Sequence, residues 1–343
     1  MMRNVAKIMV IAICVSLLLA ACGAKNADDV VRDLEQKRSK LESYKGSARM
    51  TFHTGQEPLE YDVEVWYKKD NFYRIALTNK KKDVTQIVLR NQDGVFVLTP
   101  HLKKSFRFQS NWPDNQGEIY LYQTLIDGIL KDNQRQFTVD EDSGTYLFQA
   151  AGNYKNHSFA NQKIWLNQKD YAPKRVEISD EAGNLLVELN FSDFKFGAEF
   201  TDQDFDMQHN LTMQSVTTVA QLDASMEEAD PDFGIIEPSY VPENVSLINQ
   251  PSAVKLGDQE GVMLRYGGAY NYVLIESRPQ AQTASYLTGE VVDLGFGLGV
   301  LTGEEQRTLH WTLDGVEYQL MSGDLPTEEM IAIAQSVEGQ IGK

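Results

Sequence analysis

The chain has 343 residues, of which 42% are hydrophobic, and a formal net charge of −17 at pH 7. This acidic balance makes nucleic acid a poor partner, because phosphate binding depends on a concentrated basic surface. The chain holds only two cysteines, Cys14 and Cys22, so a disulfide framework or a CxxC metal or redox site is excluded.

The pattern of residues 1–21 is that of an export signal. Arg3 and Lys7 form a short basic region, and the apolar run over residues 8–19 follows it. The run is shorter than the roughly 20 residues that a membrane-spanning helix needs. A charged tip followed by a short apolar run is typical of a secretory signal, so we expect residues 1–21 to be removed.

The junction after this run reads LAAC and ends at Cys22. It resembles the lipobox of bacterial lipoproteins at every position. The resemblance implies attachment of lipid, such as palmitate, to Cys22 and a cell-membrane location on the extracytoplasmic face. The alternative is an ordinary signal peptide with a chance cysteine. Cys14 would leave with the signal, so Cys22 would be the mature chain's single cysteine.

The charges are distributed unevenly along the chain. Residues 23–110 hold 17 Lys or Arg and 12 Asp or Glu, whereas residues 111–343 hold 13 and 37. The basic part is nearest the predicted lipid, where an anionic membrane surface would attract it. The acidic part favours a basic protein partner over anionic lipid. The alternative is a solvated surface with a chance asymmetry.

The first predicted elements are a helix over residues 28–44 and, after Gly46, strands with a period of two. In the segment LEYDVEVWYK, apolar and charged side chains alternate, as in a half-buried antiparallel strand. The apolar face is the candidate lining of a hollow and consists of Leu59, Tyr61, Val63, Val65 and Tyr67.

Further strands are predicted along the chain, interrupted by a helix over residues 118–131. The strands cover residues 71–77, 84–90, 95–99, 105–109, 136–140, 145–150, 163–167, 175–179 and 185–191. Such a series should curl into a half-barrel, a curved antiparallel sheet whose hollow the helices cover. The hollow is either filled by side chains or open to an apolar ligand.

Two segments of this region resemble LolA-type proteins. They read VFVLTPHLKKSFRF and KIWLNQKDYAPKRVEISDEAGNLLVELNFSDFKFGAEFTDQDFDM, and the resemblance covers about residues 28–208. It implies an open, curved antiparallel sheet with helices against its hollow, which in LolA shelters lipoprotein acyl chains. LolA is a soluble shuttle, whereas this chain would itself be anchored, so shuttling is not carried over.

The C-terminal part predicts a second, smaller α+β domain over residues 240–343, after an acidic linker at 211–239. The segment TLHWTLDGVEYQL alternates around an Asp-Gly pair, which is typical of a β-hairpin. With the segments YVPENVSLINQ and DLPTEEMIAIAQSV, it is similar to a domain attached to LolA-like modules in spore-forming bacteria. The combination with residues 22–210 resembles the YdcC family of sporulation lipoproteins. We therefore predict a mainly β, α+β protein of two domains.

The sequence contains no recognisable catalytic, cofactor or metal site. It has no HExxH and no GxSxG pattern. The acidic triplet at residues 202–206 lacks the glycine and the bidentate Glu of a calcium loop. The segment LGFGLGV at 294–300 imitates a phosphate loop, but no Lys or helix start follows it, so we predict a hairpin or loop.

We therefore expect a non-catalytic binding module that contacts an extracytoplasmic protein, with a link to sporulation or germination by resemblance. The alternative is a carrier of acyl chains or of another hydrophobic ligand in the hollow. A wall-modifying hydrolase is the third hypothesis.

Overall fold

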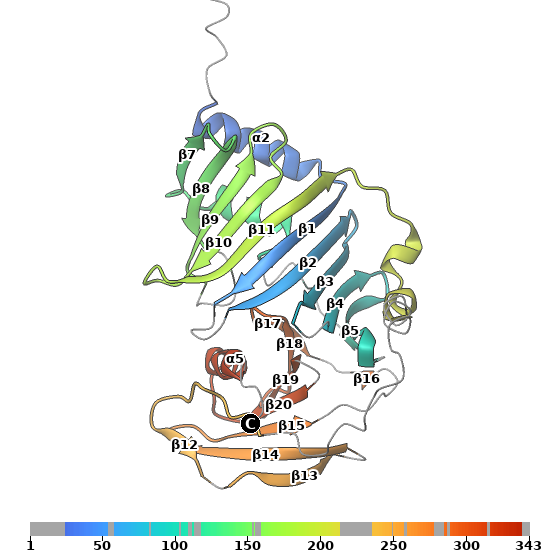
Figure 1. The fold of residues 1–343 in the computed structure, drawn as a ribbon, viewed down its shortest axis with the longest axis vertical. Helices are drawn as coiled ribbons and strands as arrows, with labels where there is room; N and C mark the ends of the chain where they lie inside the picture. Colours follow the sequence, from blue (N-terminus) through green and yellow to red (C-terminus); the bar gives the residue numbers. More distant parts are fainter. Residues whose placement is uncertain are drawn as a thin grey trace, which may run out of the picture.

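The computed structural model describes residues 25–53, 58–81, 84–102, 104–108, 112, 118–152, 154, 159–212, 235–248, 250–256, 259–277, 285–286, 289–313 and 316–337. Cys22 and the predicted signal lie outside these ranges. Two β-sheets follow one another along the long axis of the molecule, with the larger, N-terminal sheet at the top of Figure 1. The fold is mainly antiparallel β with few helices, an α+β fold, as the sequence predicts.

The first sheet has twelve strands in the order β16-β6-β5-β4-β3-β2-β1-β11-β10-β9-β8-β7. All neighbours are antiparallel except β16 and β6, which are parallel. The strand β16 comes from the C-terminal part of the chain. That part therefore forms the second sheet and also adds one strand to the first. The strands are β1 (Ser43–Phe52), β2 (Leu59–Lys68), β3 (Phe72–Asn79), β4 (Val84–Asn91), β5 (Gly94–Thr99), β6 (Lys104–Phe108), β7 (Gln136–Asp140), β8 (Thr145–Ala151), β9 (Asn161–Asn167), β10 (Pro173–Ser179), β11 (Leu185–Phe196) and β16 (Ser285–Tyr286).

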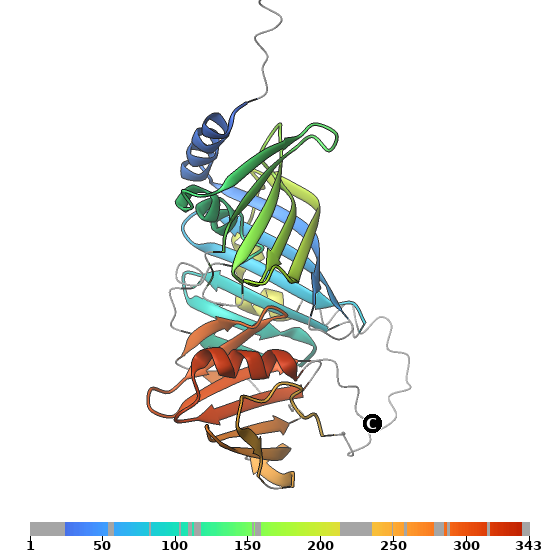
Figure 2. The same ribbon diagram turned by 90° about the vertical axis from the view of Figure 1, so that its left-hand side faces the viewer.

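Two helices, α2 (Ala27–Ser39) and α3 (Tyr122–Lys131), lie on the same side of this sheet (Figure 2). The Asn26 side chain caps α2 by accepting a hydrogen bond from the Asp29 backbone N–H. The predicted helix over residues 28–44 was too long at its end. Tyr44 belongs to β1, because the alternate residues of β1 are buried and the strand pairs on both sides, with β2 and β11. The prediction for residues 118–131 began too early, since α3 starts at Tyr122.

The opposite, outer face of the first sheet is partly covered by the segment that follows β11. The short helix η2 (Asp202–Phe205) buries Phe205 against Ile87, Leu89 and Phe96 of β4 and β5. The Thr201 backbone N–H and hydroxyl both donate to the Asp204 carboxylate, at 2.6 and 2.9 Å. The acidic triplet at residues 202–206 therefore serves to start a helical turn.

The second sheet is antiparallel and has the order β12-β14-β15-β20-β19-β18-β17, with β13 beside one half of β14. The predicted hairpin is β19–β20, in which Leu313 pairs with Val316. The strands are β12 (Val245–Leu247), β13 (Ser252–Leu256), β14 (Gln259–Gly268), β15 (Tyr272–Ser277), β17 (Glu290–Asp293), β18 (Leu298–Thr302), β19 (Arg307–Leu313) and β20 (Val316–Ser322).

The helix α5 (Thr327–Ser336) lies across one face of the second sheet (Figure 2). Its buried residues Met330 and Ile333 belong to the same hydrophobic cluster as Trp311, Tyr318 and Leu320 of the sheet. This cluster extends without a break into the first sheet. Within the described ranges, no helix has both the length and the apolar character that crossing a membrane requires.

Candidate functional site

The concave face of the first sheet, which α2 and α3 cover, contains the predicted lining residues. Tyr61, Val63, Val65 and Tyr67 are buried there, and Leu59 is partly exposed and packs against the same cluster. Alternation along β2 directs these side chains to one face, since neighbouring strand residues point to opposite sides. The sequence-predicted lining is therefore part of the hydrophobic core.

Aromatic side chains fill the middle of this face. The ring centroids of Tyr44 and Tyr67 lie 5.3 Å apart, those of Tyr67 and Tyr73 lie 5.1 Å apart, and those of Tyr73 and Trp112 lie 5.8 Å apart. Tyr44 and Trp112 are fully buried. Contacts of this kind favour close packing of rings, so side chains occupy this part of the hollow.

Polar contacts hold the helices against the filled face. The Tyr44 hydroxyl donates to Gln123 Oε1 of α3 at 2.7 Å and accepts a hydrogen bond from the Tyr122 backbone N–H at 3.2 Å. Burial raises the pKa of Tyr44 well above its usual value, so it stays neutral. Arg38 of α2 donates to Asp127 of α3 at 3.0 Å. The two helices are thus fixed to the sheet and to each other.

The other end of the concave face is closed by residues 294–298, which we call the junction loop. Phe296 of this loop is buried, and its ring centroid lies 6.4 Å from that of Phe52 at the end of β1. The Leu298 backbone N–H donates to Gln86 Oε1 of β4 at 3.0 Å. The glycine-rich segment that imitates a phosphate loop is therefore a buried contact between the two sheets.

Two carboxylates lie at this junction, one from each part of the molecule. Trp112 Nε1 donates to Glu118 Oε1 at 2.6 Å, and the Gly295 backbone N–H donates to Asp293 Oδ1 at 2.7 Å. Burial, and next the charge of Asp293, raise the pKa of Glu118, which is completely buried. Burial also raises the pKa of Asp293. The Tyr120 hydroxyl also faces Glu118.

Sequence reasoning missed this pair. Glu118 was assigned to the start of a helix and Asp293 received no role, because the two residues are far apart in the chain. No local pattern marks them; only the apolar surroundings of each acid hint at burial.

We expect Gly295→Ala to destabilise the protein more than Gly183→Ala. Both glycines have a positive φ, +79° and +85°, which costs any other residue about 1 kcal/mol. A Cβ at Gly295 would also lie 2.6 Å from the Phe52 ring, whereas one at Gly183 meets nothing within 4 Å. Overpacking adds about 1–2 kcal/mol for Gly295→Ala alone. Chemical denaturation measures both costs, and equal costs would contradict the tight junction.

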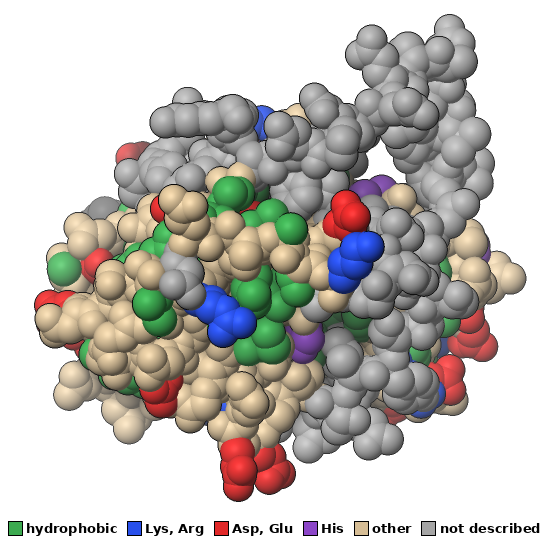
Figure 3. Space-filling model, turned by 90° about the horizontal axis from the view of Figure 1, so that it is seen from below, with side chains coloured by type: hydrophobic (Ala, Val, Ile, Leu, Met, Phe, Trp, Pro, Cys, Tyr) green, Lys and Arg blue, Asp and Glu red, His purple; other side chains and the backbone are tan. Residues whose placement is uncertain are grey.

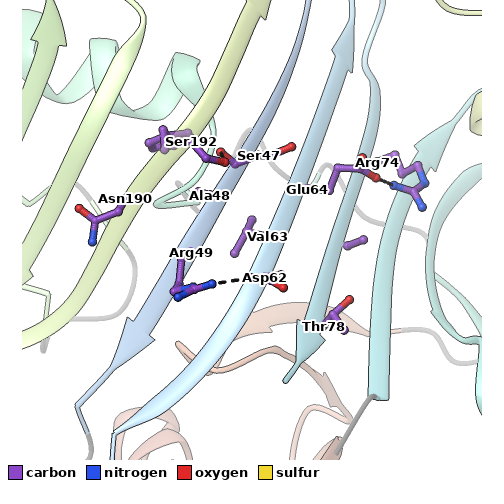
Figure 4. Close-up of a pocket in the computed structure, with 12 residues that line it drawn as sticks. Ser47, Ala48, Arg49, Asp62, Val63, Glu64, Arg74, Thr78, Asn190 and Ser192 are labelled. Carbon is purple, nitrogen blue, oxygen red and sulfur yellow. Dashed lines mark hydrogen bonds and ion pairs between the residues drawn. The ribbon is translucent and has the colours of Figure 1, made fainter. Parts of the chain in front are cut away.

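The outer face of the first sheet carries a shallow groove of about 690 Å³ over β11, β1, β2 and β3 (Figure 4). Its charged side chains pair with each other. Arg74 donates to Glu64 at 2.7 Å and to Asn210 at 2.6 Å, and Arg49 lies 3.9 Å from Asp62. Within the described part of the chain, no group of three or more His, Cys, Asp and Glu residues is arranged to hold a metal ion.

Comparison with known proteins identifies the family. The model of the family described as "Sporulation protein YdcC-like" matches residues 2–205. The chain is also 39% identical over 332 residues to sporulation protein YdcC of Bacillus subtilis (strain 168), a match that covers 95% of each chain. The chain belongs to the YdcC-like sporulation protein family.

The solved structures to which this family member is similar have low sequence identity to it. A LolA superfamily protein from Nitrosomonas europaea is 13% identical, with a TM-score of 0.30, over 54% of this chain and 100% of that chain. The MucA/MucB complex of Pseudomonas aeruginosa gives 12% identity and a TM-score of 0.33, over 89% of this chain and 96% of that chain.

Proposed function

We propose that this member of the YdcC-like family is a lipid-anchored protein on the extracytoplasmic face of the membrane and acts in sporulation by binding another protein. The observation that carries the binding mode is the closed concave face. Aromatic rings fill its middle, two bonded helices cover it, and the junction loop closes its lower end. A protein closed in this way makes contacts with its outer surfaces.

The proposal of a non-catalytic role is supported by the sequence, which has no nucleophile-and-base or metal-binding motif. The family match to a sporulation protein supports the proposed role in sporulation. The anchor is supported by the LAAC junction at Cys22.

The second candidate function is a carrier of acyl chains. The observation that favours it is the apolar character of the concave face, which would suit a hydrocarbon chain once α2 and α3 moved aside. A fluorescent fatty-acid probe distinguishes the two candidates. We expect no saturable binding at micromolar probe to delipidated protein, whereas stoichiometric, saturable binding would favour the carrier.

The anchor is tested by Cys22→Ser. We expect this variant to leave the membrane fraction or to remain uncleaved, because two or three acyl chains make a stable anchor that the variant lacks. Cys14→Ser, inside the predicted signal, is the matched control and should fractionate like the unaltered protein. Metabolic labelling with a palmitate analogue should mark the protein and the control but not Cys22→Ser. A Cys22→Ser protein that is still cleaved and bound to the membrane at high salt would refute the anchor.

A further inference from the structure

The second sheet has one face that α5 does not cover. On this face Arg265, Val273 and Met321 pair across β14, β15 and β20, whereas Ile275 and Ser277 farther along β15 are buried. Val273 and Met321 are half-buried, and Ile248 beside them is 60% exposed. Viewed from below, this part of the molecule shows hydrophobic side chains gathered near basic ones (Figure 3).

This face is hollowed. A depression of about 440 Å³ is lined by Ile248, Arg265, Val273, Met321, Gln306 and Asp324. Its rim is fixed, because the Asp324 carboxylate accepts hydrogen bonds from the Asn271 backbone N–H at 3.0 Å and from the Ser322 hydroxyl at 2.9 Å. These bonds lower the pKa of Asp324 and keep it ionised. The depression therefore combines an apolar floor with a rigid polar rim.

Arg265 is the free charge of this face. It is exposed, and among the described residues its guanidinium has no hydrogen-bond or ion-pair partner. Residues 240–343 hold 14 Asp or Glu and only 5 Lys or Arg. Of those few cations, Arg307 is committed to the fold, since it donates to Thr327 Oγ1 at 2.8 Å. Arg265 is therefore a local cation on a domain whose overall charge favours basic partners, and its guanidinium is available to an external anion.

The composition matches the centre of a protein–protein interface. Arg, Met and aromatic residues are enriched there, and an Arg surrounded by apolar side chains contributes more once water is excluded. Here the exposed Ile248 and the half-buried Val273 and Met321 are the apolar side chains near Arg265. A planar guanidinium binds a carboxylate with two parallel hydrogen bonds.

From this face we infer a docking site for a protein segment that places an Asp or Glu carboxylate between apolar side chains. The carboxylate pairs with Arg265, and the neighbouring apolar side chains cover Ile248, Val273 and Met321. The inference rests on the proposed function, since it names the surface and the partner chemistry through which the binding module acts.

Two acetylated and amidated peptides, GLELG and GLKLG, test the charge and the apolar part together. The measured signal is the methyl resonance of Met321 in the full extracytoplasmic chain. We expect GLELG to shift this resonance in a saturable way, and GLKLG to need at least tenfold more peptide. In Arg265→Glu the preference should reverse. Lys255→Glu, the same charge change at an exposed position of β13, should bind like the unaltered protein.

Equal binding of both peptides, or no shift with either, would overturn the inference. The inference would also fail if Arg265→Glu abolished capture of the protein by phosphatidylglycerol vesicles, because the face would then bind a lipid surface. It would fail as well if Arg265→Glu dissociated a dimer in sedimentation, because the face would then bind a second copy of the chain.

A photo-crosslinker at Val273 in sporulating cells separates this inference from the proposed function. We expect a crosslink to one protein through a segment that contains Asp or Glu. Arg265→Glu should abolish the crosslink, and an Arg in place of that partner acid should restore it. If a crosslinker elsewhere captures a partner while Arg265→Glu and Ile248→Asp leave it unchanged, the docking site is wrong and the binding function stands.

Discussion

Val63→Asp should lower the free energy of unfolding by about 4 kcal/mol, because it places an unpaired carboxylate in the middle of the concave face. Val63 is 2% exposed and lies between Ala48 of β1 and Leu77 of β3. The other residues of β2 on this face are Leu59, Tyr61, Val65 and Tyr67, so the strand itself offers no basic side chain to pair with a new charge. Chemical denaturation followed by circular dichroism measures the loss.

Glu60→Ala on the same strand is the matched control. Glu60 is exposed on the outer face, so we expect a change within about 0.5 kcal/mol. Glu64 is less suitable, since it pairs with Arg74, whose side chain is only 10% exposed. Equal small effects of Val63→Asp and Glu60→Ala would contradict the assignment of Val63 to a filled core.

Glu118→Gln should stabilise the protein at pH 8, by about 2–4 kcal/mol. Folding raises the pKa of Glu118 above that of an ordinary carboxyl group. At a pH above the ordinary carboxyl pKa, the folded protein therefore binds more protons than the unfolded chain. Stability therefore falls as pH rises from about 5 towards 8. Gln keeps the oxygen that accepts from Trp112 and carries no charge to bury. The groups that face Glu118 are Asp293 and Tyr120, and both would be relieved of a negative neighbour.

Denaturation at pH 5, 6.5 and 8 measures this change. We expect Glu118→Gln to flatten the pH dependence without removing it, because burial also raises the pKa of Glu276 in the second sheet to about 7. Glu35→Gln on the exposed side of α2 is the control and should leave the slope unchanged. If Glu118→Gln keeps the full slope, the junction carboxylates do not take up protons on folding.

The sequence predicts well what local periodicity determines. The burial of alternate residues in β2 and the β19–β20 hairpin follow from patterns that repeat every two residues. The same reasoning failed at Tyr44, where apolar spacing fitted both a helix and a strand and pairing with two neighbours decided for the strand.

The junction could not be predicted, because it depends on residues that are distant in the chain. Phe52 meets Phe296, and Gln86 binds the Leu298 backbone, only after both sheets have formed. Arg265 was equally hidden. Its significance comes from the absence of a described partner and from the cross-strand neighbours Val273 and Met321, and neither is visible in a linear sequence.

The position of α2 at one end of the long axis and of the second sheet at the other has a consequence for orientation (Figure 1). Ala27 begins α2 five residues after Cys22, and that stretch spans about 18 Å at most. A lipid on Cys22 would therefore hold the α2 end close to the bilayer, with the second sheet at the opposite end of the long axis. The depression around Arg265 belongs to the second sheet, so it would then lie far from the bilayer and within reach of proteins that extend or diffuse beyond the membrane surface.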